Sequence, residues 1–165
     1  GGLIKDKEKI INEAFKTIKC EESTNETSHQ TSNSQEINSS TEMEIDLKEA
    51  FINYQQGRLS ETIKKLDMII ESSLKDDNTL QQDPFWKTLS CGVFKAIALN
   101  YFYNNKELKN NDLNELLKDK EKIRNNLSEF CNNFRGKQEI NFIYLVEKIS
   151  DKMLDSVIDI IRTNF

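Results

Sequence analysis

The cysteines and the single histidine are the residues best suited to nucleophilic or metal chemistry. Cys20, Cys91 and Cys131 lie far apart, no CxxC pair occurs, and His29 stands in a polar tract. A zinc site needs about four nitrogen or sulfur ligands, and a nucleophilic cysteine or serine needs a positioned base. The sequence therefore predicts no metal site and no nucleophilic catalysis.

Paired carboxylates are the remaining candidates for catalysis. Asp76 and Asp77 are adjacent, and Asp151 and Asp155 are spaced to share one helix face. Acidic residues on exposed helix faces are usually solvated surface. No GxxxxGK[ST] loop occurs that would hold a phosphate. We therefore predict no catalytic residues and no bound cofactor, so the chain alone is not expected to be an enzyme.

A basic run provides the candidate contact with a partner or with DNA: Lys118, Lys120, Lys122 and Arg124. Acidic residues interrupt the run, a pattern typical of a solvated helix face. The whole chain has a net charge of -5 and a pI near 5.1. Because phosphate neutralisation dominates the affinity for nucleic-acid backbone, we expect no stable DNA binding. Transient contact with single-stranded DNA is the alternative.

The elements that position these residues are predicted to be helices throughout the chain. One proline and five glycines are too few for a sheet-and-turn architecture, and no period-2 pattern appears. No segment approaches about 18 consecutive apolar residues, and no signal peptide is visible. Unpaired cysteines fit a reducing compartment. We expect an all-α cytoplasmic protein without direct membrane contact.

The chain divides into three predicted parts. Residues 1–19 form an amphipathic helix, and residues 20–43 form a polar segment rich in Ser, Thr, Asn and Glu. This segment cannot bury enough apolar area to offset an ordering entropy of about 1–2 kcal/mol per residue, so a disordered loop is predicted. Residues 44–165 form a compact helical bundle, for a total of six to eight helices.

Capping residues and glycines mark the helices of this bundle. Order is expected from Ile45, and Gly57 separates the two helices of an antiparallel hairpin. Asp83 is suited to be an N-cap, and Pro84 to be the first residue of a long apolar central helix. A final helix is expected to begin near Ser150. No period-2 strand competes with these helices.

Phe85 and Trp86 follow that cap directly and invite two interpretations. Two adjacent aromatic rings can form a box that stacks on a ligand. Alternatively, they pack the first turn of the central helix into the core. Aromatic side chains dominate the packing of protein cores, so core packing is the favoured interpretation.

Two segments of the chain carry a family resemblance. One is the sequence Asp83-Pro84-Phe85-Trp86 with the apolar helix that follows it, and the other is the segment 152–158 with the closing Phe165. Both resemble landmarks of the coupling-protein ATPases of conjugative type IV secretion. In that family an all-α domain is inserted between the Walker A and Walker B regions. The resemblance covers residues 58–165. Neither Walker region is present, and residues 3–57 have no counterpart.

The resemblance implies an excised all-α domain of a bacterial ATPase whose parent is a hexamer. There the domain lies at the cytoplasmic mouth of the ring and contacts relaxosome components, transferred DNA or both. ATP hydrolysis would belong to the parent protein, and the isolated domain is expected to be monomeric. Acidic charge favours a protein partner over bare DNA. The leading hypothesis is therefore substrate recognition, by docking of a relaxase or a relaxosome accessory protein.

Two other hypotheses stay open. One is a tetratricopeptide-like or generic helical scaffold for protein–protein interaction, unrelated to DNA transfer. Ala50, Tyr54, Gly57 and Ile63 match half of such a repeat, but no second copy follows, and about three repeats are needed for stability. The other is a small helical regulator that dimerises through the apolar stripe of residues 1–19.

Overall fold

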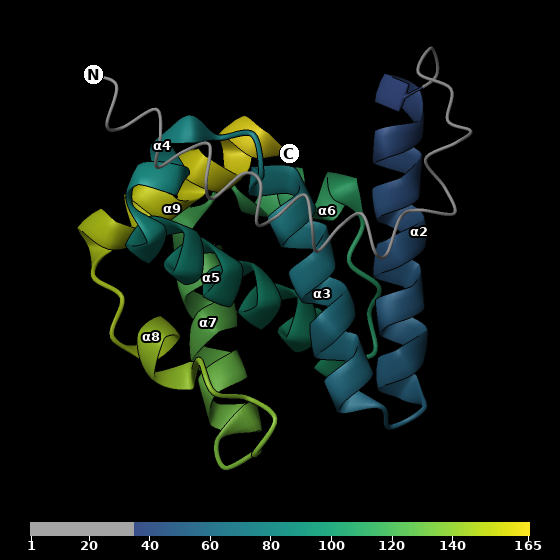
Figure 1. Ribbon diagram of the computed structural model, residues 1–165. Helices are drawn as coiled ribbons and strands as arrows, with labels where there is room; N and C mark the ends of the chain where they lie inside the picture. Colours follow the sequence, from purple (N-terminus) through teal and green to yellow (C-terminus); the bar gives the residue numbers. More distant parts are fainter. Residues whose placement is uncertain (1–34) are drawn as a thin grey trace.

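The computed structural model describes the backbone from residue 35 to residue 165 and the side chains from residue 42 onward. The predicted helix over 1–19, Cys20 and His29 lie outside the described residues. The described chain contains eight helices and no strand, which confirms the predicted all-α bundle (Figure 1). The helices are α2 Gln35–Gln55, α3 Leu59–Leu74, α4 Asn78–Gln82, α5 Pro84–Tyr103, α6 Asn110–Leu116, α7 Lys120–Phe134, α8 Ile143–Glu147 and α9 Asp151–Asn164.

Helix α2 begins at Gln35, earlier than the start expected near Ile45. It therefore includes residues 35–43 of the segment for which the sequence predicts a loop; the rest of that segment, 20–34, lies outside the described residues. Leu47 and Ala50 anchor the C-terminal half of the helix in the core. Once those turns are formed, extension toward the N-terminus needs only helix propagation, which costs far less than nucleation.

Helices α2 and α3 form the predicted antiparallel hairpin at one side of the molecule (Figure 1). Gly57 turns the chain with φ +77, a value that favours glycine. Ala50 and Thr62 are fully buried where the helices meet, and the Thr62 hydroxyl donates to the carbonyl oxygens of Arg58 at 2.8 Å and Ala50 at 3.4 Å. Small side chains at this contact let the two backbones approach closely.

Helix α5 is the centre of the bundle, as predicted. The Asp83 carboxylate accepts a hydrogen bond from the backbone N–H of Phe85 at 3.2 Å, and Pro84 occupies the first turn. Helices α3, α4, α7, α8 and α9 all contact α5. Because neighbours surround it, α5 buries residues on every side rather than along one stripe.

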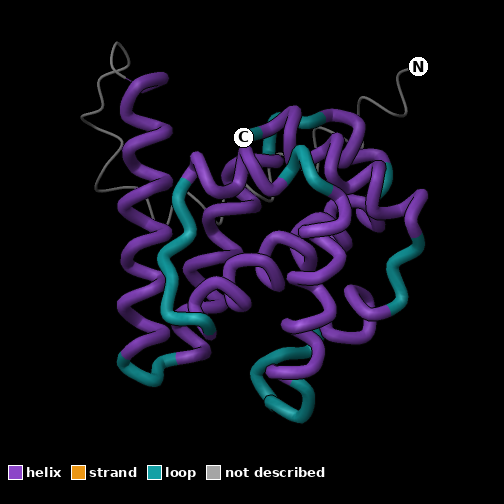
Figure 2. Tube along the Cα trace, turned by 180° about the vertical axis from the view of Figure 1, so that it is seen from behind, coloured by secondary structure: helices purple, strands orange, loops and turns teal. Residues whose placement is uncertain are grey.

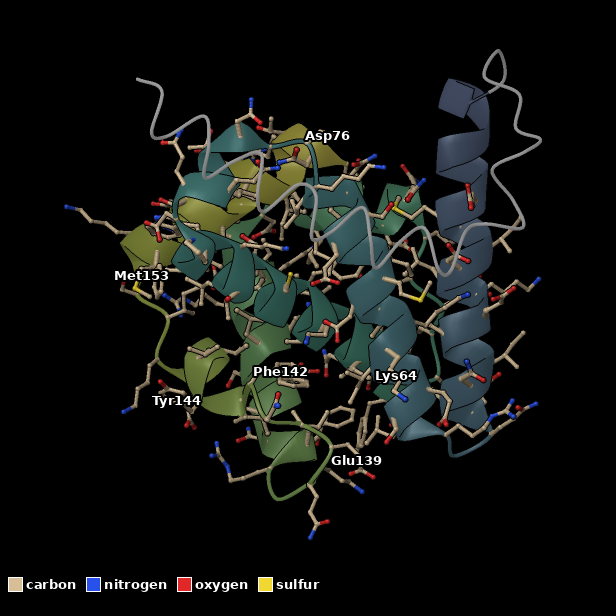
Figure 3. The ribbon with its side chains drawn as sticks, viewed as in Figure 1. Lys64, Asp76, Glu139, Phe142, Tyr144 and Met153 are labelled. Atoms are coloured by element: carbon tan, nitrogen blue, oxygen red, sulfur yellow. The ribbon has the colours of Figure 1, made fainter. Side chains whose placement is uncertain are left out.

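An aromatic cluster joins α7 to the segment leading into α8. The Phe130 ring stacks on Phe134 and Phe142, with centroids 5.1 and 5.6 Å apart, and the ammonium of Lys95 lies 4.3 Å from the Phe142 centroid. Figure 3 shows Phe142 among the helices and Tyr144 at the outer edge of α8, where it is exposed. Stacked rings of this kind add to the energy of burial.

Loops hold the remaining helices in place. The segment between α5 and α6 runs beside α2 in both views (Figure 1, Figure 2), where the Gln55 side chain donates to Asn105 Oδ1 at 3.2 Å and Leu108 is fully buried. At the C-terminus, Asn164 Nδ2 donates to Asp77 at 2.9 Å, and the Phe165 ring lies 5.4 Å from that of Phe94.

Across the described residues, every helix falls short of the length and apolarity that a membrane crossing needs.

Candidate functional site

The candidate basic residues lie just before and within the first turns of α7, and three of them are in ion pairs. Arg124 donates to Asp151 from Nη2 at 2.7 Å and from Nε at 3.1 Å. Lys120 reaches Asp155 at 3.0 Å, and Lys118 reaches a carboxylate of α6 at 3.3 Å. Opposite charges at these distances cancel most of each other's field. Three of the four basic side chains are therefore paired with carboxylates, two on α9 and one on α6.

The candidate carboxylate pairs have structural partners as well. Asp151 and Asp155 are the very groups that hold Arg124 and Lys120. The hydrogen bond from Arg124, followed by the charges of Lys120 and Arg124, lowers the pKa of Asp151. A carboxyl whose pKa is lowered stays ionised near neutral pH and is a poor general acid. The Asp151 carboxylate is therefore suited to ion pairing.

Asp76 and Asp77 do not act together either. Asp76 is exposed at the end of the molecule next to α4 (Figure 3). Asp77 is the N-cap of α4 and accepts from Thr79 N at 3.0 Å. Burial alone would raise the pKa of Asp77, but hydrogen bonds from Asn164, Thr79 and Leu80 outweigh it and lower that pKa. The Asp77 carboxylate thus has a capping role.

Charge neutralisation by α9 has a measurable consequence. Asp151→Asn/Asp155→Asn frees the two basic side chains that these carboxylates bind, so the affinity for a labelled single-stranded oligonucleotide is expected to rise about threefold or more at low salt. Fluorescence anisotropy measures this affinity. The control Asp76→Asn/Glu42→Gln removes the same charge from exposed positions elsewhere. An equal rise in that control would contradict local masking of the basic run.

Neither described cysteine is an activated thiol. Cys91 and Cys131 are buried and unpaired. Burial raises the pKa of Cys91 to about 12, and burial together with the charge of Glu147 raises the pKa of Cys131. The nucleophilic species is the thiolate, so both thiols behave as small core side chains. Over residues 42–165, no three His, Cys, Asp or Glu side chains are grouped to hold a metal ion.

Phe85 and Trp86 divide between surface and core. Trp86 packs against the core at its margin, whereas Phe85 is 47% exposed. The two rings meet edge to face with centroids 5.1 Å apart. Successive side chains on a helix point about 100° apart, and at the start of α5 Trp86 points toward the core whereas Phe85 points away from it. The core-packing interpretation holds for Trp86, and Phe85 is exposed.

A polar cluster between α5 and α7 was missed by sequence reasoning. Asn100 is 3% exposed, and its Nδ2 donates to Asn126 Oδ1 at 2.8 Å and to Glu129 Oε1 at 3.3 Å. Its Oδ1 is buried and accepts no hydrogen bond from any residue that the structure describes. The sequence feature that could have revealed this cluster is the polar side chain of Asn100 within α5, the most apolar of the described helices. Buried polar groups almost always have a partner in the protein or an ordered water.

The chain was compared with protein-family models, with curated proteins and with solved structures, and none of the three comparisons gave a match.

Proposed function

We propose that the chain is a protein-docking domain, and that it serves substrate recognition in a conjugative type IV secretion coupling protein. Its partner would be a relaxase or a relaxosome accessory protein. The observation that carries the proposal is the exposed Phe85, which lies within the very segment, Asp83 to Trp86, that resembles the family. The segment begins the central helix of the bundle, so its rings are attached to the most firmly packed element.

The geometry at this segment suits a binding anchor. Phe85 is held against Trp86, which is itself packed on the core, so little side-chain freedom remains to be lost on binding. Aromatic residues are enriched among the few that dominate protein–protein affinity. Phe85 is about half exposed in the isolated chain. A partner that covers it would gain apolar burial at low entropic cost.

Charge also favours a protein partner over DNA. Three of the four residues of the basic run pair with carboxylates of α6 and α9, and the chain has a net charge of -5. Such a surface repels phosphate at long range. Contact with single-stranded DNA therefore remains secondary in this proposal and would require the ion pairs between α7 and α9 to open.

The test is a mating assay with Phe85→Ala in the parent protein. Transfer frequency is expected to fall about tenfold or more, because an anchor residue is removed from the docking surface. Stability should change by less than about 1 kcal/mol, because the ring is half exposed. Tyr144→Ala removes another exposed aromatic ring, on α8, and should leave transfer unchanged. Equal transfer by wild type and Phe85→Ala, with equal protein levels, would contradict the proposal.

A second candidate function, a tetratricopeptide-like scaffold, is favoured by the α2–α3 hairpin. Its close contact at Ala50 and Thr62 uses small buried side chains, which such hairpins require. In that case the partner surface would include the outer side of α2, where Ile45 and Ile52 are exposed. Ile52→Glu would then abolish binding, and Phe85→Ala would not. The parent reading frame separates the two candidates further, since only a coupling protein has Walker A and Walker B regions around the domain.

A further inference from the structure

We propose that residues 3–19 of the same chain dock as a helix on the outer face of α2, antiparallel to it. Ile45 and Ile52 define that face: they are 52% and 40% exposed and lie seven residues apart on α2. At about 100° per residue, their side chains point within about 20° of each other. Leu47, which is buried, points roughly 160° away from Ile45. The two isoleucines therefore form one apolar stripe on the side of α2 opposite the core.

The sequence of residues 3–19, for which an amphipathic helix is predicted, carries a stripe with the same spacing. Isoleucines recur in it every seven residues: Ile4, Ile11 and Ile18. A seven-residue repeat is the one by which two helices pack along a common seam, and its members are about 10.5 Å apart along either helix. In an antiparallel register, Ile18 lies level with Ile45 and Ile11 lies level with Ile52. Both pairs can therefore meet at once.

The charges of the two surfaces are complementary. Residues 3–19 contain five lysines and three acidic residues, a net charge of +2, whereas α2 contains five acidic residues and one lysine, a net charge of -4. Two of the α2 carboxylates pair with a lysine of α3 at 3.3 and 2.8 Å, but Glu42 and Glu44 are exposed and form no ion pair with a described side chain. In the antiparallel register Lys19 lies level with Glu44, so opposite charges meet beside the apolar contact.

The connection to α2 is long enough for this arrangement. Fifteen residues, 20–34, join the segment to α2, and they can span roughly 50 Å when extended. The antiparallel register places Lys19 about 14 Å along the helix axis from Gln35, and a parallel register would place it about twice as far away. Stretching the connection lowers its conformational entropy, which favours the antiparallel register. Because the segment is tethered, a modest contact area can hold it.

The test is paramagnetic broadening in the full ¹⁵N-labelled chain, with a nitroxide label near the start of the segment. Lys5→Cys combined with Cys20→Ser provides one reactive thiol, because Cys91 and Cys131 are buried. In the antiparallel register Lys5 lies level with the turn after α2. The backbone amide signals of residues 52–58 are therefore expected to lose most of their intensity, and to regain it when the label is reduced.

Matched variants of the segment separate docking from a merely nearby label. Ile11→Glu/Ile18→Glu places two charges on the apolar stripe and should restore the signals of residues 52–58. Asn12→Glu/Thr17→Glu adds the same charge away from the stripe, at about 100° or more from its centre, and should leave the broadening in place.

The same comparison on α2 tests the other side of the contact. Ile52→Glu should restore the signals, whereas Met68→Glu, at a 45% exposed position of α3, should not. Equal effects of target and control variants would overturn the proposal, as would equal intensities with oxidised and reduced label. Broadening confined to residues 35–45 would indicate a parallel helix and would contradict it too.

A mixed sample distinguishes this arrangement from docking on a second copy. Nitroxide-labelled chains without ¹⁵N are mixed with ¹⁵N-labelled chains that carry no nitroxide, so any broadening arises between molecules. The signals of residues 52–58 are expected to keep their full intensity in this mixture. Broadening equal to that in the singly labelled chain would show that the segment binds α2 of another copy, and would overturn the intramolecular arrangement.

Discussion

Phe130→Ala is expected to lower the free energy of unfolding by about 3–5 kcal/mol. The Phe130 ring is fully buried and stacks between Phe134 on the same helix and Phe142 before α8. Truncation leaves a cavity at the point where α7 and the segment into α8 meet, and both stacked contacts are lost. Since a domain of this kind is stable by only about 5–15 kcal/mol, the loss would be a large part of the total. Urea denaturation followed by circular dichroism measures it.

The matched control is the same substitution at a half-exposed ring. Phe85→Ala removes as many atoms, but Phe85 is 47% exposed, so the expected loss is less than about 1 kcal/mol. A comparable loss in both variants would mean that the cluster around Phe130 does not form the core described here. Phe130→Leu fills part of the space and should recover much of the stability.

Asn100→Asp is expected to destabilise the protein by about 3–5 kcal/mol at neutral pH. The substitution places a carboxylate in a buried position beside the carboxylate of Glu129, whose Oε1 lies 3.3 Å from the present amide nitrogen. It also removes the donor on which Asn126 depends. Asn104→Asp makes the same chemical change at an exposed position of the same helix end, and its cost should stay below about 1 kcal/mol.

The loss caused by Asn100→Asp should depend on pH in a defined direction. Burial and the neighbouring negative charge both raise the folded-state pKa of the introduced carboxyl. A raised pKa favours the protonated folded state, so the variant should be close to wild type below the unfolded-state pKa of about 4. Its stability relative to wild type then falls as the pH rises through the folded-state pKa. A loss that stays constant from about pH 4 to pH 8 would contradict the predicted burial of the charge.

Local signals predicted the helices well. Asp83 and Pro84 mark the start of α5, Gly57 marks the hairpin, and Ser150 caps α9, accepting from Met153 N at 3.2 Å. Each of these features depends on residues within a turn of one another. The start of α2 has no such local capping signal, and the sequence predicted it near Ile45 rather than at Gln35.

The candidate sites were harder to predict, because their partners are distant in the sequence. Arg124 and Asp151 pair across the α7–α9 contact, and Asn100 and Glu129 pair across the α5–α7 contact. Periodicity shows which face of a helix is apolar, but it does not show which polar groups meet when two helices pack. For the same reason the exposure of Phe85 became visible only when α5 was placed among its neighbours.

The proposed role of the chain as a docking domain is tested most directly by affinity capture. The domain is used as bait in a lysate of a conjugation-competent donor, with mass spectrometry as the readout and Phe85→Ala as the matched bait. Enrichment of a relaxase or its accessory proteins on the wild type, and its loss on Phe85→Ala, is the predicted result. Recovery of general chaperones only, at equal levels on both baits, would contradict substrate recognition by this domain.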